Sequence, residues 1–166
     1  HYIKKCKKII CCDISSTDII RHVIKDNPQT ILHLAANAYV PYSFEHPLEV
    51  NAANVIGTLN ILEAARQIKG IERIVCTSSS EVYGTALTKK INEDHPLNPT
   101  SPYAASKAAA DRYCFSYIKT YGLPIVIIRP FNTYGPRHTY DVIPKFIKMA
   151  INNENITIHG DGKQSR

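Results

Sequence analysis

Short apolar runs alternate with longer amphipathic stretches along this chain. Runs of a length suited to buried strands occupy residues 7–12, 30–36, 72–78 and 125–130, with a shorter run at 156–159. Helical spacing of apolar residues marks residues 18–25, 48–68, 101–121 and 141–152. Because strands that alternate with helices usually lie parallel, the pattern predicts an α/β fold with a parallel sheet.

Helix-ending residues support these boundaries. Pro28, Gly70 and Gly122 each follow an expected helix, and Pro102 stands at a helix start, where proline is tolerated. The expected helix at 48–68 carries one apolar stripe, formed by Val50, Ala53, Ile56, Leu59, Leu62, Ala65 and Ile68.

Length and composition limit the class of protein. The 166 residues suit a single domain, and 44% hydrophobic residues can form a buried core. No apolar run approaches the ~20 residues that span a bilayer, and the basic start is not followed by a signal-peptide core. The first residue is not methionine, so we expect a segment of a longer protein, without a membrane partner.

The net charge and the cysteines are less informative about function. The net charge of +6 fits either a solvated basic face or attraction to a polyphosphate ligand. The lysines at 4, 5, 7 and 8 lack an aromatic platform, so nucleic-acid binding is not expected. The five cysteines show no metal-ligand or disulfide spacing. Cys11, Cys12 and Cys76 lie in apolar runs, which predicts buried free thiols in a reducing compartment, the cytoplasm.

The residues with the clearest chemistry are Tyr103 and Lys107. Their spacing places both side chains on one face of the helix expected at 101–121. A nearby positive charge lowers the pKa of a phenol and makes it a usable base. An exposed, inert pair would have the same spacing, so the pair alone does not decide between these interpretations.

Two strand ends supply further polar side chains. Ser79 and Glu81 follow the run at 72–78, and Asn132 follows the run at 125–130. In open α/β sheets, ligands bind beyond the carboxyl ends of the strands. We therefore expect these residues to meet Tyr103 and Lys107 there.

At this point the chain resembles the extended short-chain dehydrogenase/reductase family, and within it the NAD-dependent nucleotide-sugar epimerases and dehydratases. The resemblance lies in HLAA at 33–36, NVIGT at 54–58, SSSEVYG at 78–84, the Tyr103/Lys107 pair, RPFNTYGPR at 129–137 and GDGKQSR at 160–166. It implies a Rossmann-like, doubly wound parallel sheet that binds NAD, acts on a nucleotide-diphosphate sugar and often dimerises through the helices at 48–68 and 101–121.

The resemblance also implies residue roles. Tyr103 would be the base at the sugar C4 hydroxyl, Lys107 would lower its pKa, and Ser79 would hold the same oxygen. Glu81 and Ser80 would serve a second step at C5 and C6. The implied cofactor contacts are Asp13, Ile14, Leu34, Ala35, Ala36, Tyr39, Asn54, Tyr103, Lys107 and Pro130. The implied substrate contacts are Ser79, Asn132 and Arg166. Asp13 could instead cap a helix, and His33 is expected to be structural.

Two segments typical of that family are missing from the sequence. There is no glycine before Gly57, so the first strand and its glycine-rich phosphate turn are absent, and so is the C-terminal substrate lobe. We expect a partial NAD-binding Rossmann domain over 1–166, an internal fragment that alone is inactive and binds NAD poorly. A fragment completed by a partner is the alternative.

Glu81 selects among the possible activities. Dehydratases that resemble this chain have a glutamate there, which favours a 4,6-dehydratase. Ser80 replaces the aspartate of the dTDP-glucose type, which argues against that substrate. The alternatives are UDP-glucuronate decarboxylase, a 4-epimerase, or a catalytically silent cofactor-binding or interaction module.

Overall fold

The computed structural model describes residues 6–139, 141–158 and 160–161. Its elements, in chain order, are α1 (Asp18–Asp26), β1 (Thr30–His33), α2 (Tyr42–Glu45), α3 (Pro47–Asn51), a π-helical turn η2 (Ala52–Ile56), α4 (Gly57–Gln67), β2 (Arg73–Thr77), a 3₁₀ turn η3 (Ser80–Tyr83), α5 (Pro102–Tyr121), β3 (Ile125–Ile128) and α6 (Val142–Ile151). The described part therefore alternates strands and helices, as the apolar pattern predicted.

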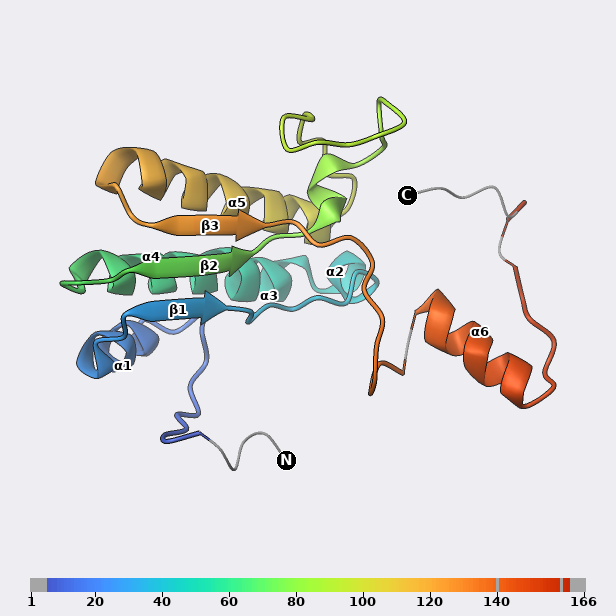
Figure 1. The fold of residues 1–166 in the computed structure, drawn as a ribbon, viewed down its shortest axis with the longest axis horizontal. Helices are drawn as coiled ribbons and strands as arrows, with labels where there is room; N and C mark the ends of the chain where they lie inside the picture. The colour runs from blue at the N-terminus through green and yellow to red at the C-terminus, as the bar shows by residue number, and fades with distance from the viewer. Residues whose placement is uncertain (1–5, 140, 159, 162–166) are drawn as a thin grey trace.

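The three strands form one parallel sheet in the order β1-β2-β3. Figure 1 shows α3, α4 and α5 behind this sheet, and α1 packs against α4. The main core lies between the sheet and these helices. It consists of Leu62, Ala65, Ile74, Cys76, Cys114, Leu123 and Ile125. The α/β architecture with a parallel sheet is confirmed.

Side chains on the other face of the sheet are much more exposed. Leu32 of β1 is 65% exposed, and Val126 and Ile128 of β3 are 47% and 40% exposed. Parallel sheets are normally covered on both faces. In the described residues this sheet is covered by helices on one face (Figure 1).

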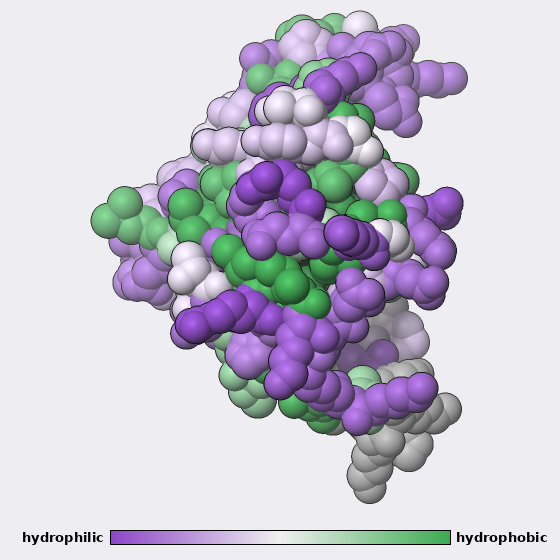
Figure 2. Space-filling view, turned by 90° about the vertical axis from the view of Figure 1, so that its left-hand side faces the viewer, coloured by the Kyte–Doolittle hydropathy of each residue, from purple (hydrophilic) through white to green (hydrophobic). Residues whose placement is uncertain are grey.

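The strands all run toward one edge, which fixes where the polar loops gather. In Figure 1 the three arrows point to the right, where the loops after β1, β2 and β3 emerge. Figure 2 looks at the opposite end, where the strands begin, and shows hydrophobic residues framed by hydrophilic ones. The candidate residues therefore lie at the edge away from the viewer of Figure 2.

Two predicted strands are wrong. Residues 7–12 form no strand, Ile9 is 60% exposed, and the thiols of Cys11 and Cys12 are exposed rather than buried. The run is apolar enough for a strand, but it pairs with none of the three described strands, and without that ladder an extended segment is not held. Residues 156–158 also lie outside any strand, and His159 is outside the described residues.

The helix expected at 48–68 is interrupted by the π-helical turn η2. The N–H of Gly57 donates to the carbonyl of Ala52, five residues earlier. The extra residue rotates the apolar stripe, so Ile56, predicted to be buried, is 40% exposed, whereas Asn54 and Val55 are buried. The stripe prediction is wrong at this one turn. None of the helices in the described ranges is long and apolar enough to cross a membrane.

Candidate active site

Ser79 begins the short turn that carries Ser80 and Glu81. Its backbone is extended, and its hydroxyl accepts a hydrogen bond from the Glu81 N–H at 3.2 Å, which caps η3. The N–H of Ser80 donates to the carbonyl of Pro130 at 3.1 Å. The loops that follow β2 and β3 are thus joined by their backbones, directly beyond the ends of the two strands.

Tyr103 lies in the first turn of α5. Ser101 caps this helix by accepting the Ala104 N–H at 3.1 Å, and Pro102 occupies the first helical position. Tyr103 is 7% exposed. Burial raises the pKa of the Tyr103 phenol, a hydrogen bond with Ser79 lowers it, and the charge of Glu81 raises it again. The structure therefore brings Ser79, Glu81 and Tyr103 within interaction distance of one another.

Lys107 is buried one helical turn after Tyr103, with 4% exposure. Its ammonium donates to the backbone carbonyl of Thr77 at 2.5 Å, at the end of β2. Burial lowers the pKa of Lys107, although Cys114, Cys76 and Asp111 act in the opposite direction. The pKa of Tyr103 is raised because the phenol is buried, and the Lys107 ammonium is held at the Thr77 carbonyl, so the lowering of that pKa by Lys107 stays a prediction.

An open hollow of about 880 Å³ lies beyond the end of β1. It is lined by Ile14, Ala35, Ala36, Asn37, Ala38, Tyr39 and Ala53. Four alanines leave room for a flat ring system against the backbone. The neighbouring Asp13 has a lowered pKa because it accepts hydrogen bonds from the backbone and side chain of Ser15, so it is ionised and can accept from ribose hydroxyls. These residues fit the adenosine end of NAD.

Two buried asparagines hold the walls of this hollow. The Asn54 side chain accepts the Asn37 N–H at 2.8 Å and donates to the Asn37 carbonyl at 3.1 Å and to the Ser106 hydroxyl at 2.9 Å. Asn60 donates to the carbonyls of Ile14 and Ser16 at 2.9 and 3.2 Å. Asn54 therefore ties the hollow to the helix of Tyr103.

The remaining candidates are dispersed. Leu34 is 68% exposed and does not line the hollow, and Pro130 lines a different pocket. Asn132 lies exposed in the loop after β3, and Arg166 is outside the described residues. His33 is buried, contacts the Thr58 hydroxyl at 2.9 Å, and has its pKa lowered to about 4 by burial and then by Lys107, which agrees with a structural role.

The residues that support the catalytic side chains were not predicted from the sequence. Asp111 is buried in α5, and Arg129 contacts both it and Tyr83. Asp111 stands four residues after Lys107, on the same helical face, and that spacing was an available signal. Thr77 and Ser106 act through a backbone carbonyl and a hydroxyl that no motif marks.

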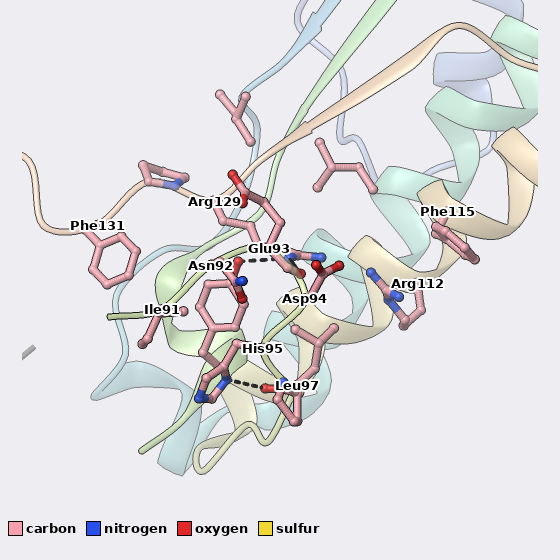
Figure 3. A pocket seen from close by; sticks show the side chains of 15 residues that line it. Ile91, Asn92, Glu93, Asp94, His95, Leu97, Arg112, Phe115, Arg129 and Phe131 are labelled. Carbon is pink, nitrogen blue, oxygen red and sulfur yellow. Dashed lines mark hydrogen bonds between the residues drawn. The ribbon is translucent and has the colours of Figure 1, made fainter. Parts of the chain in front are cut away.

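The pocket around Arg129 and Tyr83 is shown in Figure 3. It has a volume of about 860 Å³ and lies between the 91–97 loop, the end of β3 and the side of α5. Arg129 reaches across it toward the backbone of Glu93, and Phe131 and Phe115 lie at opposite sides. The pocket adjoins the strand-end residues without containing Ser79, Glu81 or Tyr103.

Comparison with known proteins gives consistent relatives. The chain is 40% identical over 162 residues to human dTDP-D-glucose 4,6-dehydratase, covering 96% of this chain and 46% of the human protein. It is 37% identical over 164 residues to a trifunctional Arabidopsis thaliana UDP-glucose 4,6-dehydratase, covering 96% of this chain and 24% of that protein. The similarity to a dTDP-D-glucose enzyme runs against the expectation drawn from Ser80.

Solved structures agree with the fold. UDP-glucuronic acid 4-epimerase from Bacillus cereus, in complex with UDP-glucuronic acid and NAD, superposes with a TM-score of 0.86 at 30% identity, covering 98% of this chain and 52% of its own. A double mutant of dTDP-glucose 4,6-dehydratase from Streptomyces venezuelae, with NAD bound, gives 0.79 at 34% identity, covering 91% and 47%. This confirms the Rossmann-like sheet.

These matches also define the extent of the chain, which spans about half the length of the human relative and of both solved structures. The family model described as GDP-mannose 4,6 dehydratase matches residues 1–166, the whole of the sequence. The chain therefore belongs to the GDP-mannose 4,6-dehydratase family.

Proposed function

We propose that the complete protein is an NAD-dependent nucleotide-sugar 4,6-dehydratase. The observation that carries this proposal is the convergence of Ser79, Glu81 and Tyr103 at the end of β2 and the start of α5. The family match and the 4,6-dehydratases among the relatives support it. Bound NAD⁺ would supply a temporary acceptor for the C4 hydrogen of the sugar, which returns at C6.

The residues of this chain divide the proton transfers between two positions. Tyr103 takes the proton of the C4 hydroxyl, and Ser79 hydrogen-bonds the same oxygen. Burial holds the Tyr103 phenol protonated, so this transfer needs a positive charge beside it, which Lys107 supplies when its ammonium leaves the Thr77 carbonyl. The resulting C4 ketone makes the hydrogen on C5 acidic.

Elimination then uses the two residues at the start of η3. Glu81 takes the proton from C5, a C5–C6 double bond forms, and the C6–O bond breaks. Ser80 passes the proton from Glu81 to the departing hydroxyl, so water leaves and the carboxylate is restored. After the hydrogen returns to C6, C5 takes up a solvent proton through Glu81, and Tyr103 releases the proton that it took from the C4 hydroxyl. The net change is the loss of one water, and the product is a 4-keto-6-deoxy sugar. In this proposal Asn132 and Arg166 contact the substrate diphosphate, as arginine suits that group.

We propose that NAD binds in the hollow beyond the end of β1. Asp13 and Ile14 contact its adenosine, and Leu34, Ala35, Ala36, Tyr39, Asn54 and Pro130 complete the contacts with Tyr103 and Lys107. Of these, Ile14, Ala35, Ala36 and Tyr39 line the hollow, which supports their assignment.

The setting of the protein is part of the proposal. We place the protein in the cytoplasm, because all five cysteines are free. We also propose a homodimer through the helices expected at 48–68 and 101–121, which correspond in the structure to α3, η2, α4 and α5. The exposed Ile56, Tyr113, Phe115 and Tyr121 support that surface, and light scattering of the complete protein would measure the oligomer.

The test is to incubate the complete protein with NAD⁺ and a panel of nucleotide sugars and to measure product mass. Loss of water from a hexose is expected. Loss of carbon dioxide from a uronate would mean a decarboxylase, an isobaric product a 4-epimerase, and no product a silent module. Tyr103→Phe should abolish turnover and preserve substrate binding by calorimetry, and unchanged turnover would refute its role. The 166-residue chain alone should bind NAD poorly in the same calorimeter.

A further inference from the structure

A buried ion pair joins α5 to the end of β3. The side chain of Asp111 is fully buried, and Arg129, the residue after β3, binds it through two hydrogen bonds, Nε to Oδ2 at 2.8 Å and Nη2 to Oδ1 at 3.0 Å. Arg112 donates to the same Oδ1. Burial acts to raise the pKa of Asp111, but the bonds from Arg129 and Arg112 hold it below its usual range. The mechanism above makes no use of this charged group.

The same arginine reaches a third element. Its Nη1 donates to the Tyr83 hydroxyl at 2.9 Å and to the Glu93 carbonyl at 3.2 Å. Tyr83 is 4% exposed, and its ring packs with Val82 and Ala108 in a small core of its own. Since Tyr83 ends η3, two residues after Glu81, the guanidinium connects the Glu81 turn to α5.

The position of Asp111 along α5 indicates which part of the site this connection affects. Asp111 lies one helical turn beyond Lys107 and two beyond Tyr103 on the same face. Tyr103 itself is fixed by the capped start of α5, which does not involve Arg129. Loosening the guanidinium contact would therefore displace the turn of Glu81 and leave the helix of Tyr103 in place.

We propose that the Asp111–Arg129–Tyr83 bridge is a positioning device that sets Glu81 for the elimination of water, separately from the oxidation at C4. The inference rests on the proposed function, since it assigns the bridge to one half of that reaction. Arg129 and Tyr83 touch neither reacting atom. They act through the placement of the η3 turn.

The test uses Tyr83→Phe in the complete protein. This change keeps the buried ring and the Asp111–Arg129 pair, and removes only the hydroxyl that Arg129 contacts. Tyr117→Phe is the matched control, because it removes a tyrosine hydroxyl bonded to Glu63 at 2.6 Å, elsewhere on α5. Arg129→Lys is the second variant, which keeps the charge beside Asp111 but not the two-pronged contact.

Two measurements separate positioning from general support. In quenched single turnovers, elimination of water should be about tenfold slower in Tyr83→Phe and Arg129→Lys, the effect expected from losing one charge-assisted hydrogen bond. The keto sugar that retains its C6 oxygen should therefore accumulate about tenfold over wild type. The rate of C4 oxidation should stay within about twofold. Hydrogen exchange of the 80–84 amides should accelerate in Tyr83→Phe and not in Tyr117→Phe.

Each result decides between explanations. Equal slowing of oxidation and elimination would overturn the inference and make the bridge a general support of the fold. Unchanged elimination in Tyr83→Phe, with wild type active, would overturn it while leaving the proposed function intact. If wild type removes water from no nucleotide sugar, the proposed function fails and the elimination role fails with it. Exchange at 80–84 then reports only whether the bridge orders that turn.

Discussion

The side chain of Asn54 should contribute more to stability than any surface amide of this chain. It is 1% exposed and makes three hydrogen bonds, two with the backbone of Asn37 and one with the Ser106 hydroxyl. Asn54→Ala removes all three and leaves the Asn37 groups without this partner. At roughly 1 kcal/mol for each bond, the free energy of unfolding should fall by about 3 kcal/mol.

Urea unfolding of the complete protein measures this loss, with Asn152→Ala as the control. Asn152 donates one hydrogen bond, to Glu154 on an exposed surface, and its loss should change the unfolding free energy by less than about 0.5 kcal/mol. Because Asn37 lines the hollow, Asn54→Ala should also weaken NAD binding measured by calorimetry.

Asn54→Asp distinguishes the loss of the hydrogen bonds from the loss of side-chain volume that Asn54→Ala also causes. The aspartate keeps an acceptor for the Asn37 N–H, loses both donors and puts a carboxylate into a buried site. It should destabilise at neutral pH and partly recover on acidification, because protonation removes the buried charge. If Asn54→Ala and Asn152→Ala unfold at the same urea concentration, the reasoning from buried hydrogen bonds is wrong for this site.

Two further predictions concern single residues. The folded-state pKa of His33, about 4, lies below its ordinary value of 6.5, so its contribution to stability is present above pH 6.5 and declines toward pH 4, by about 3 kcal/mol in all. His33→Gln should flatten the pH dependence of urea unfolding across that range, and an unchanged slope would contradict this. Gly84→Ala places a Cβ 1.9 Å from the carbonyl oxygen of Asn98 at a positive φ of 65°, whereas Gly122→Ala, at a φ of 67°, meets nothing within 4 Å. The first should destabilise by clearly more than the ~1–2 kcal/mol of a left-handed alanine, and the second by about that amount, so equal unfolding midpoints would refute the steric argument.

The sequence predicted elements whose signals are local. The 102–121 helix has its serine cap, proline and terminal Gly122, and the structure places its bounds within one residue of the prediction. The strands at β2 and β3 also formed where continuous apolar runs stand between turn residues. Their shared edge then followed from parallel alignment alone, which is why Ser79, Glu81 and Tyr103 could be expected to meet.

The failures concern interactions between distant residues. The run at 7–12 has strand composition, but a strand also needs a neighbour to bond, and composition does not report one. The bridge from Asp111 to Arg129 joins residues eighteen apart whose types are common on surfaces. The direction in which Lys107 points depends on a backbone carbonyl of Thr77, which every residue possesses. All three depend on how the chain packs in three dimensions, and no local pattern carries that information.

The π-helical turn η2 has a consequence for how sequences of this family can change length. Its surplus residue lets Asn54 face the Tyr103 helix while the following residues of α4 pack against α1. Deleting one residue between 52 and 56 would restore regular winding and rotate Asn54 by about 100° relative to Gly57. The amide would then leave Asn37 and Ser106 although every other side chain were retained. The spacing from Asn54 to Gly57 should therefore tolerate substitutions more readily than insertions or deletions, so that the number of residues in this turn is inherited more strictly than their identity.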